Sequence, residues 1–251
     1  MPQTLTEIRE EPAARGIRPK HKFGQNFLHD HNQLRKLLSA ADVQPGELVL
    51  EVGPGTGTLT ETLMDAGCEV VACELDRDMA EIVRGRNAHR MGATPGKVTL
   101  VEADCLDGKH ALGAKALEAL GGRPFVLVAN LPYQAATPLM ATLLERHPEC
   151  RGQFVTIQRE VGDRLMAKAG DDAYGPISVT MSLLADVEQV AVLPPGCFWP
   201  APKVTSAQPS EPPETILLHR AAERSSPAVN IDAINPSACP AWSELGSISA
   251  A

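Results

Sequence analysis

Between residues 48 and 160 the chain alternates short apolar runs with segments whose apolar residues recur at helical spacing. The apolar runs are Leu48–Val52, Glu69–Leu75, Val98–Ala103, Phe125–Asn130 and Phe154–Gln158. The helical segments between them are Thr58–Ala66, Asp78–Arg90, Ala111–Leu120 and Pro138–Arg146. This alternation predicts an α/β fold, a parallel sheet with helices on both faces. Ligands of such sheets bind at the carboxyl ends of the strands, so the residues just past each run are the candidates for chemistry.

The overall composition is that of an ordinary globular protein, with 43% hydrophobic and 22% charged residues. No window approaches the roughly 18 uninterrupted apolar residues of a membrane helix. The N-terminus lacks the apolar core of a signal peptide, so we expect a cytoplasmic protein without a membrane partner. The six cysteines are scattered without C-x-x-C spacing, which favours reduced thiols over zinc or disulfides, and we expect no metal.

The net charge of −8 argues against a general nucleic-acid binder, so an RNA partner would need a local basic patch. Residues 15–22 form such a patch, with four cations and no acid. On charge alone a solvated N-terminal arm is the favoured interpretation. The alternative is that this arm, residues 1–24, contacts RNA through Arg15, Arg18, Lys20 and Lys22.

The first apolar run ends in a glycine-rich turn, Glu51-Val-Gly53-Pro-Gly55-Thr-Gly57. Glycines at alternate positions let the backbone turn sharply and let a ligand approach the main chain closely. The dinucleotide fingerprint G-x-G-x-x-G is not met, because position 58 is Thr. The spacing G-x-G-x-G after an acidic strand residue is instead typical of S-adenosylmethionine-dependent methyltransferases, although such turns also occur for structural reasons alone.

The second and third apolar runs end in acidic residues. Glu74 follows Gly55 by nineteen residues, the spacing at which a carboxylate accepts hydrogen bonds from the ribose hydroxyls of a bound nucleoside. Asp104 follows the third run and would accept the exocyclic amine of the cofactor's adenine. Surface acids before a helix, like Asp76 and Asp78, or a helix-capping role for Asp104, are the structural alternatives.

The fourth apolar run ends in Asn130-Leu131-Pro132-Tyr133. A plain turn is the structural alternative for this sequence. Because Pro132 fixes a stiff turn at the edge of the sheet, the Asn130 side-chain oxygen and the Leu131 carbonyl would point into the site as two acceptors. Two acceptors match the two hydrogens of an adenine N6 amine and would aim its lone pair at a sulfonium methyl. Tyr133 would offer its ring to a base that has left its stack.

Six motifs along the chain resemble, in order, those of the ribosomal RNA adenine N6-dimethyltransferases, which modify two adjacent adenines near the 3′ end of small-subunit rRNA. The resemblance covers roughly residues 18–207, and the combination of NLPY with the QNFL arm is highly specific. The motifs are KFGQNFL (22–28), EVGPGTG (51–57), ELD (74–76), EAD (102–104), NLPY (130–133) and FWPAPKV (198–204).

The resemblance implies a seven-stranded, Rossmann-like class I methyltransferase domain over residues 25–207, with S-adenosyl-L-methionine as cofactor. It also implies that the target adenine lies between Tyr133 and Phe198, and that the partner is small-subunit rRNA within a pre-ribosomal particle. With the glycine turn included, the cofactor contacts that we expect are Asn26, Leu28, Gly53, Gly55, Glu74, Asp104 and Asn130.

The chain departs from the family pattern after about residue 207. The family continues with the last, interior strand of the sheet and then a basic helical domain, whereas prolines follow here at 209, 212 and 213. Residues 208–251 carry two arginines, no lysine and five acids, the wrong sign for holding RNA. Proline is excluded from central strands, so we expect a gap or a short stub in the sheet and a divergent, disordered tail without the helical domain. Thr215–His219 would form at most a stray strand or turn.

Three other functions remain open from the sequence. A large-subunit rRNA adenine methylase of the antibiotic-resistance type shares the fold and a similar Asn-Pro motif, and FWPAPKV and Leu131 favour the small-subunit enzyme over it. A non-catalytic ribosome-assembly factor would bind cofactor and immature subunits without turnover. A nicotinamide-dependent dehydrogenase is disfavoured by the glycine spacing.

Overall fold

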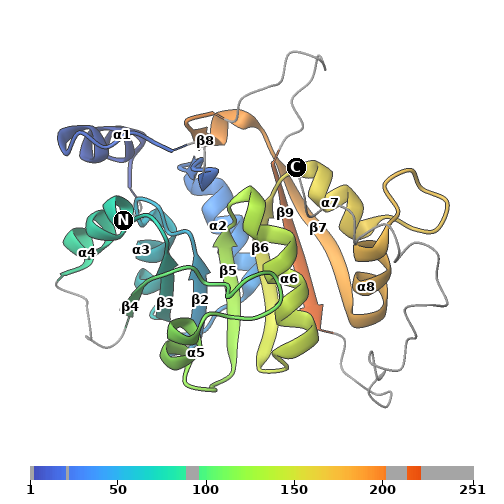
Figure 1. The fold of residues 1–251 in the computed structure, drawn as a ribbon. Helices are drawn as coiled ribbons and strands as arrows, with labels where there is room; N and C mark the ends of the chain where they lie inside the picture. Colours follow the sequence, from blue (N-terminus) through green and yellow to red (C-terminus); the bar gives the residue numbers. More distant parts are fainter. Residues whose placement is uncertain (1–2, 21–22, 89–95, 202–213, 222–251) are drawn as a thin grey trace. The chain divides into compact units, whose positions relative to one another are not determined.

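The computed structural model describes residues 3–20, 23–88, 96–201 and 214–221 of the 251-residue chain. Its centre is a seven-stranded sheet with the strand order β4-β3-β2-β5-β6-β9-β7 (Figure 1). The strands are β2 (Leu48–Val52), β3 (Glu69–Glu74), β4 (Lys97–Glu102), β5 (Phe125–Asn130), β6 (Cys150–Ile157), β7 (Ala185–Leu193) and β9 (Glu214–Ala221).

The five strands predicted from the apolar runs are all present, and neighbours among β4, β3, β2, β5 and β6 pair in parallel. The predicted α/β fold is thereby confirmed. The chain winds outward from β2 through β3 to β4 and then crosses back to β5 on the other side of β2. The order reverses between β2 and β5, which is where a doubly wound sheet binds its ligand.

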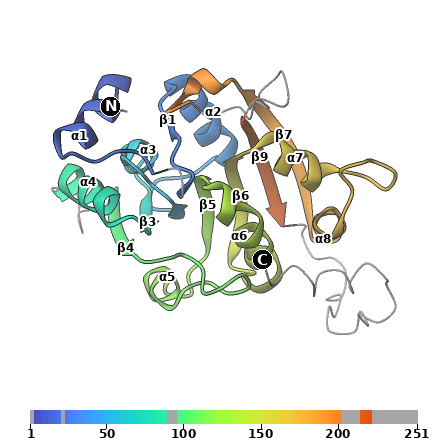
Figure 2. The ribbon, with the colours of Figure 1, turned by 45° about the horizontal axis from the view of Figure 1, so that its top comes forward.

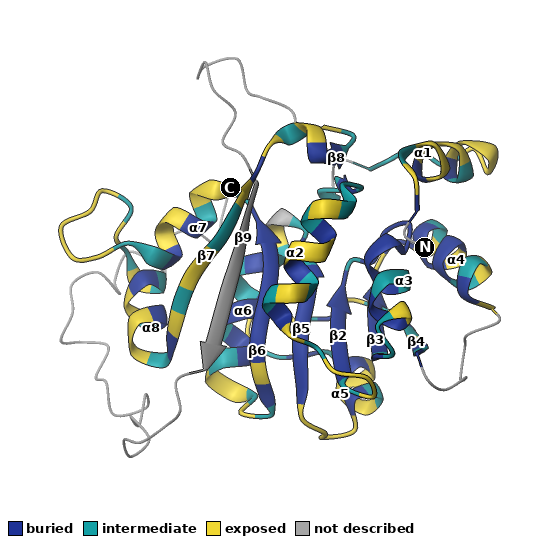
Figure 3. Ribbon diagram, turned by 180° about the vertical axis from the view of Figure 1, so that it is seen from behind, coloured by how far each residue is buried: buried dark blue, intermediate teal, exposed yellow. Residues whose placement is uncertain are grey.

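Helices cover both faces of this sheet. Alternate residues of a strand point to opposite sides, and in β2 and β5 the residues on both sides are buried. Figure 3 shows the strands at the centre of the sheet as almost entirely buried. On one face, α5 (Ala114–Leu120), α6 (Tyr133–Arg146), α7 (Arg159–Met166) and α8 (Pro176–Leu184) pack in one core cluster with residues such as Leu50 and Leu127. On the other, α2 (His31–Ala41) and α3 (Thr58–Asp65) pack in a second cluster with residues such as Val49 and Val126.

Four further elements, two helices and two short strands, pack together beside the sheet. Helices α1 (Leu5–Ala14) and α4 (Arg77–Asn87) lie beside each other in both views of the ribbon (Figures 1 and 2). The short strands β1 (Phe27–Leu28) and β8 (Phe198–Trp199) pair antiparallel. Residues of these elements, including Ile8, Phe27 and Met79, form a third, smaller apolar cluster.

The prediction of a gap or a short stub in the sheet, with Thr215–His219 forming at most a stray strand or turn, is wrong. Strand β9 lies between β6 and β7 and pairs antiparallel with both. Prolines 212 and 213 precede the strand at Glu214 and so do not interrupt its hydrogen-bond ladder. Residues 202–213 and 222–251, where the rest of the predicted disordered tail falls, lie outside the described residues.

A proline in β9 tests its central position. Every N–H of a strand with neighbours on both sides belongs to a ladder, so Leu217→Pro should lose a hydrogen bond and destabilise the fold by roughly 2 kcal/mol or more. Val190→Pro is the control, because Val190 sits in the bulge of β7, the edge strand, where the pairing with β9 skips a residue. Thermal unfolding of both variants gives the answer. Equal effects, or a neutral Leu217→Pro, would contradict the observed strand order.

Candidate functional site

The carboxyl ends of β2 and β5 meet at the glycine-rich turn. Gly53 has φ 72° and donates its N–H to the Cys73 carbonyl at 2.9 Å, which ties the turn to β3. A Cβ on Gly53 would lie 3.3 Å from Cδ of Pro132, so the turn and the NLPY segment touch. The prolyl ring packs this closely because residue 53 has no side chain.

Glu74 lies at the end of β3 with its side chain directed at this turn. Its Oε2 accepts the Gly55 N–H at 3.1 Å and its Oε1 accepts the Asp76 N–H at 2.9 Å. Burial raises the pKa of the Glu74 carboxyl to about 7, against the lowering effect of these two hydrogen bonds. A carboxylate offers about four lone-pair sites, so its two oxygens retain capacity for the two ribose hydroxyls of a nucleoside.

Asn130 is the last residue of β5 and faces residues 15–28, the basic patch and the QNFL segment, which together are called the arm from here on. Its Nδ2 donates to the Asn26 carbonyl at 2.7 Å, so the amide oxygen is the acceptor atom of this side chain. The Leu131 N–H continues the ladder to the Thr156 carbonyl at 3.1 Å, and the Leu131 side chain is buried. The chain turns at Pro132, and α6 begins at Tyr133.

The arm closes against the glycine turn through β1. A Cβ on Gly55 would come within 2.5 Å of the Phe27 ring, so the ring lies directly on the backbone of the turn. The space that remains there is about 20 Å³, which is room for one water. It is lined by Phe27, Leu28, Leu34, Glu51, Gly53, Pro54, Thr56, Thr58, Leu59 and Asn130. Six of the seven predicted cofactor contacts therefore come together: Asn26, Leu28, Gly53, Gly55, Glu74 and Asn130.

Other predicted site residues are placed differently. Asp104 is exposed after β4, and its Oδ1 accepts the Leu106 N–H at 2.9 Å. It therefore stabilises a local turn and does not cap a helix, because α5 begins only at Ala114. Phe198 is only 3% exposed, packed in the core with its backbone paired to Leu28, so its ring offers no open face to a base. Tyr133 is the first residue of α6, and its side chain lies outside what the structure describes.

Two of the four cations predicted to contact RNA are bound within the protein. The Nζ of Lys20 lies 2.7 Å from carboxylate oxygens of both Asp76 and Asp78, and Arg15 pairs with Glu11 at 3.2 Å. Arg18 is exposed, and Lys22 lies outside the described residues. RNA contact by this segment stays a prediction, with Lys20 the least suited to it.

Sequence reasoning missed the polar hub at Asp76. Besides Lys20, its carboxylate accepts from Gln25 Nε2 at 2.9 Å, and its backbone N–H holds Glu74. The arm is thus coupled through one residue to the carboxylate predicted to bind the ribose. The acidic Asp76 and Asp78 after β3 were read as surface acids, and only the opposite charge on the distant arm could have suggested the pairing.

Among residues that the structure describes, no cluster of three or more His, Cys, Asp or Glu side chains could hold a metal ion. In the same part of the chain, no helix is long and apolar enough to cross a membrane.

The fold and this site define a class I S-adenosylmethionine-dependent methyltransferase. Similar solved structures include a dimethyladenosine transferase from Plasmodium falciparum, with a TM-score of 0.62, 25% identity and coverage of 78% of this chain and 64% of that one. The 23S rRNA methyltransferase ErmE has a TM-score of 0.61 and 25% identity, covering 80% of this chain and 71% of that one.

The chain belongs to the ribosomal RNA adenine dimethylase family, whose sequence model matches residues 16–208. It is 37% identical over 227 residues to a ribosomal RNA small subunit methyltransferase A from Streptomyces griseus, covering 90% of this chain and 75% of that protein. The protein of the same name from Cutibacterium acnes is 40% identical over 191 residues, covering 76% of this chain and 61% of that protein. The chain thus spans about three fifths to three quarters of these relatives. The family and the fold identify S-adenosyl-L-methionine as the cofactor.

Substitution of Gly55 tests whether the contact between the turn and the arm shapes the cofactor site. Gly55→Ala should push the Phe27 ring away and weaken S-adenosylhomocysteine binding about tenfold or more, measured by calorimetry. Gly46→Ala is the matched control, because Gly46 also has positive φ (84°) but nothing within 4 Å of its Cβ position. Both variants carry the backbone strain of a left-handed alanine, and only one carries the clash. Equal affinities of the two variants for S-adenosylhomocysteine would show that the contact between Gly55 and Phe27 does not shape the cofactor site.

Glu51 predicts a pH dependence of stability. It is fully buried beside α3, where the Thr60 hydroxyl donates to its Oε2 at 2.6 Å. Burial is the main reason that its pKa is raised from 4.5 to about 8. Between these values the folded state binds more protons than the unfolded chain, so the free energy of unfolding should decrease as pH rises. Glu74 acts with the same sign.

Denaturant unfolding of the wild type and of Glu51→Gln, measured from pH 5 to pH 8, tests this dependence. Glutamine keeps an acceptor for Thr60 and cannot ionise, so the variant should show a shallower decline with pH. Parallel curves for the two proteins would mean that Glu51 does not titrate in this window.

Proposed function

We propose that the chain transfers methyl groups from S-adenosyl-L-methionine to N6 of two adjacent adenines in a hairpin near the 3′ end of small-subunit rRNA, giving N6,N6-dimethyladenine during ribosome biogenesis. The observation that carries the proposal is the placement of Asn130-Leu131-Pro132 at the end of β5, against the glycine turn after β2. The acceptor pair for the adenine amine and the cofactor loop then share one edge of the sheet.

The residues suit S-adenosyl-L-methionine, which when bound supplies an electrophilic methyl group on a sulfonium. Glu74 would accept hydrogen bonds from the ribose, and Gly53 and Gly55 of the turn would line the cofactor pocket. Asp104 would accept from the adenine of the cofactor with the oxygen that does not cap the local turn. Asn26 and Leu28 of the arm would close this pocket on the side that faces Asn130.

On the substrate side, the Asn130 side-chain oxygen and the Leu131 carbonyl would each accept one hydrogen of the target N6 amine. This holds the nitrogen lone pair toward the methyl group, and such positioning lowers the barrier of a displacement. Tyr133, at the start of α6, would stack on the flipped base. Phe198 would take part only if its buried ring became accessible.

The small-subunit substrate is favoured by the relatives from Streptomyces griseus and Cutibacterium acnes, which are ribosomal RNA small subunit methyltransferases. We place the activity in the cytoplasm, on a pre-ribosomal particle. The large-subunit alternative draws on the structural similarity to ErmE, a 23S rRNA methyltransferase. The assembly-factor alternative requires cofactor binding without turnover.

Labelled methyl transfer into separated ribosomal subunits that lack the modification distinguishes these functions, with base analysis of the product. The proposal expects N6,N6-dimethyladenine in small subunits only. Label in large subunits would support the antibiotic-resistance type of methylase. Binding of S-adenosylhomocysteine with no label in either subunit would support the assembly factor.

Asn130→Ala tests the proposed acceptor. Loss of one preorganised contact of this kind typically costs about 10²–10³ in rate, so kcat for methyl transfer should fall by that factor. Gln134→Ala is the control, since Gln134 is exposed four residues further on. Circular dichroism checks that both variants fold. Near-wild-type turnover by Asn130→Ala would remove the mechanism.

A further inference from the structure

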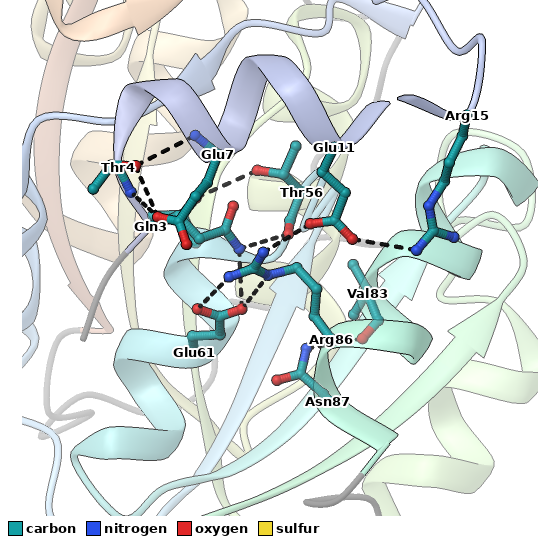
Figure 4. A network of polar contacts seen from close by, with 11 residues as sticks. Gln3, Thr4, Glu7, Glu11, Arg15, Thr56, Glu61, Val83, Arg86 and Asn87 are labelled. Atoms are coloured by element: carbon teal, nitrogen blue, oxygen red, sulfur yellow. Dashed lines mark hydrogen bonds and ion pairs between the residues drawn. The ribbon is translucent and has the colours of Figure 1, made fainter. Parts of the chain in front are cut away.

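Gln3, which precedes α1, contacts the glycine turn at Thr56, although the two residues are 53 positions apart in the sequence. The residue is 1% exposed. Its Nε2 donates to the Thr56 carbonyl at 2.8 Å and to Glu61 Oε1 at 3.0 Å (Figure 4). The backbone carbonyl of Gln3 accepts from His31 Nε2 at 2.8 Å. One residue therefore connects the turn with the first turn of α3 and the start of α2.

Arg86 of α4 completes this network. Its Nε lies 2.6 Å from Glu61 Oε1, the same oxygen that accepts from Gln3, and its Nη1 lies 2.7 Å from Glu11 Oε2 in α1 (Figure 4). The arginine is 22% exposed and Glu61 13%, so the pair is more shielded from solvent than an ordinary surface ion pair. The network links α1 to α3 and α4 next to Gln3.

An apolar contact reaches the turn by a second route. Ile8 of α1 is completely buried in the cluster that contains Phe27, Met79 and Ile82. The ring of Phe27 in turn lies on Gly55. The N-terminal segment thus contacts the turn directly at Thr56, through Gln3, and indirectly at Gly55, through Ile8 of α1 and the ring of Phe27.

We infer that Gln3 and helix α1 are positioning elements of the cofactor site, which hold the turn of residues 53–57 in its binding conformation. The inference rests on the proposed function only in that this turn binds S-adenosylmethionine. Residues 3–15 precede the segment matched by the family model, which begins at residue 16. A turn with glycines in positive φ at 53, 55 and 57 has more backbone freedom to lose than other sequences, so fixing it in advance improves affinity.

The experiment measures S-adenosylhomocysteine affinity in the full chain by calorimetry, for wild type and Gln3→Met. Methionine has nearly the shape of glutamine but donates no hydrogen bond, so the packing is kept and the contact to Thr56 is lost. The Kd should rise about tenfold, and the KM for the cofactor should rise with it while kcat and the KM for RNA stay unchanged. Amide hydrogen exchange of residues 53–58 should accelerate.

Glu10→Gln is the control, because Glu10 is exposed on the same helix. A second variant, Glu11→Gln, weakens the link between α1 and Arg86 at a partly exposed position where folding is not at risk. It should raise the Kd about threefold and decides the matter if Gln3→Met does not fold.

Unchanged affinity in Glu11→Gln and in folded Gln3→Met would overturn the inference, as would an equal loss in Glu10→Gln. Lower thermal stability with unchanged Kd and unchanged exchange in the turn would also overturn it, since α1 would then only pack. If the wild type itself fails to bind S-adenosylhomocysteine, the proposed function fails instead, so the two failures are distinguishable.

Discussion

The absence of side chains at Gly53 and Gly55, in the turn after β2, is the constraint on which the site depends. At Gly53 the missing Cβ lets the Pro132 ring approach to van der Waals contact, and at Gly55 it leaves space that the Phe27 ring fills. The positive φ values of both residues also require glycine. Three segments far apart in sequence can therefore meet at one edge of the sheet: the arm, the turn and the NLPY segment.

Hydrogen bonds then fix what the close approach permits. Glu74 is buried and is held by two backbone N–H groups, one from the turn and one from Asp76. Asp76 is in turn held by Lys20 and Gln25 of the arm. The arm, Asp76 and Glu74 thus form one chain of hydrogen bonds, so the conformation of the arm and the orientation of the Glu74 carboxylate are coupled. Partly buried networks of this kind are rigid only while each member keeps its partner.

Much of this arrangement was predictable from the sequence. Apolar runs located all five parallel strands, and the carboxyl ends of those strands gave Gly53, Glu74 and Asn130, because neighbouring parallel strands end at the same edge. Errors arose where proline has two possible meanings. The sequence pattern predicts a helix start at Pro138, yet this residue lies inside α6, which begins at Tyr133. The prolines at 212 and 213 predict an interrupted strand, whereas β9 begins after them, at Glu214.

Contacts of the N-terminal segment were not predictable in the same way. Gln3 and Thr56 are 53 residues apart. Neither the spacing of apolar residues nor a local sequence motif predicts a single hydrogen bond between a side chain and a distant carbonyl. The ion pairs of Lys20 and Arg86 are of the same kind. For Lys20, the charge pattern suggests a solvated or RNA-binding cation, whereas the tertiary fold supplies carboxylates.

The measurement that tests the central claim most directly is a crystal structure of the full chain with S-adenosylhomocysteine. The account predicts the ligand at the carboxyl edge of the sheet, with its ribose hydroxyls on Glu74, its sulfur near Asn130, and the arm packed over the turn. A ligand bound elsewhere, or bound with Glu74 and Asn130 more than about 5 Å away and out of hydrogen-bonding reach, would contradict it.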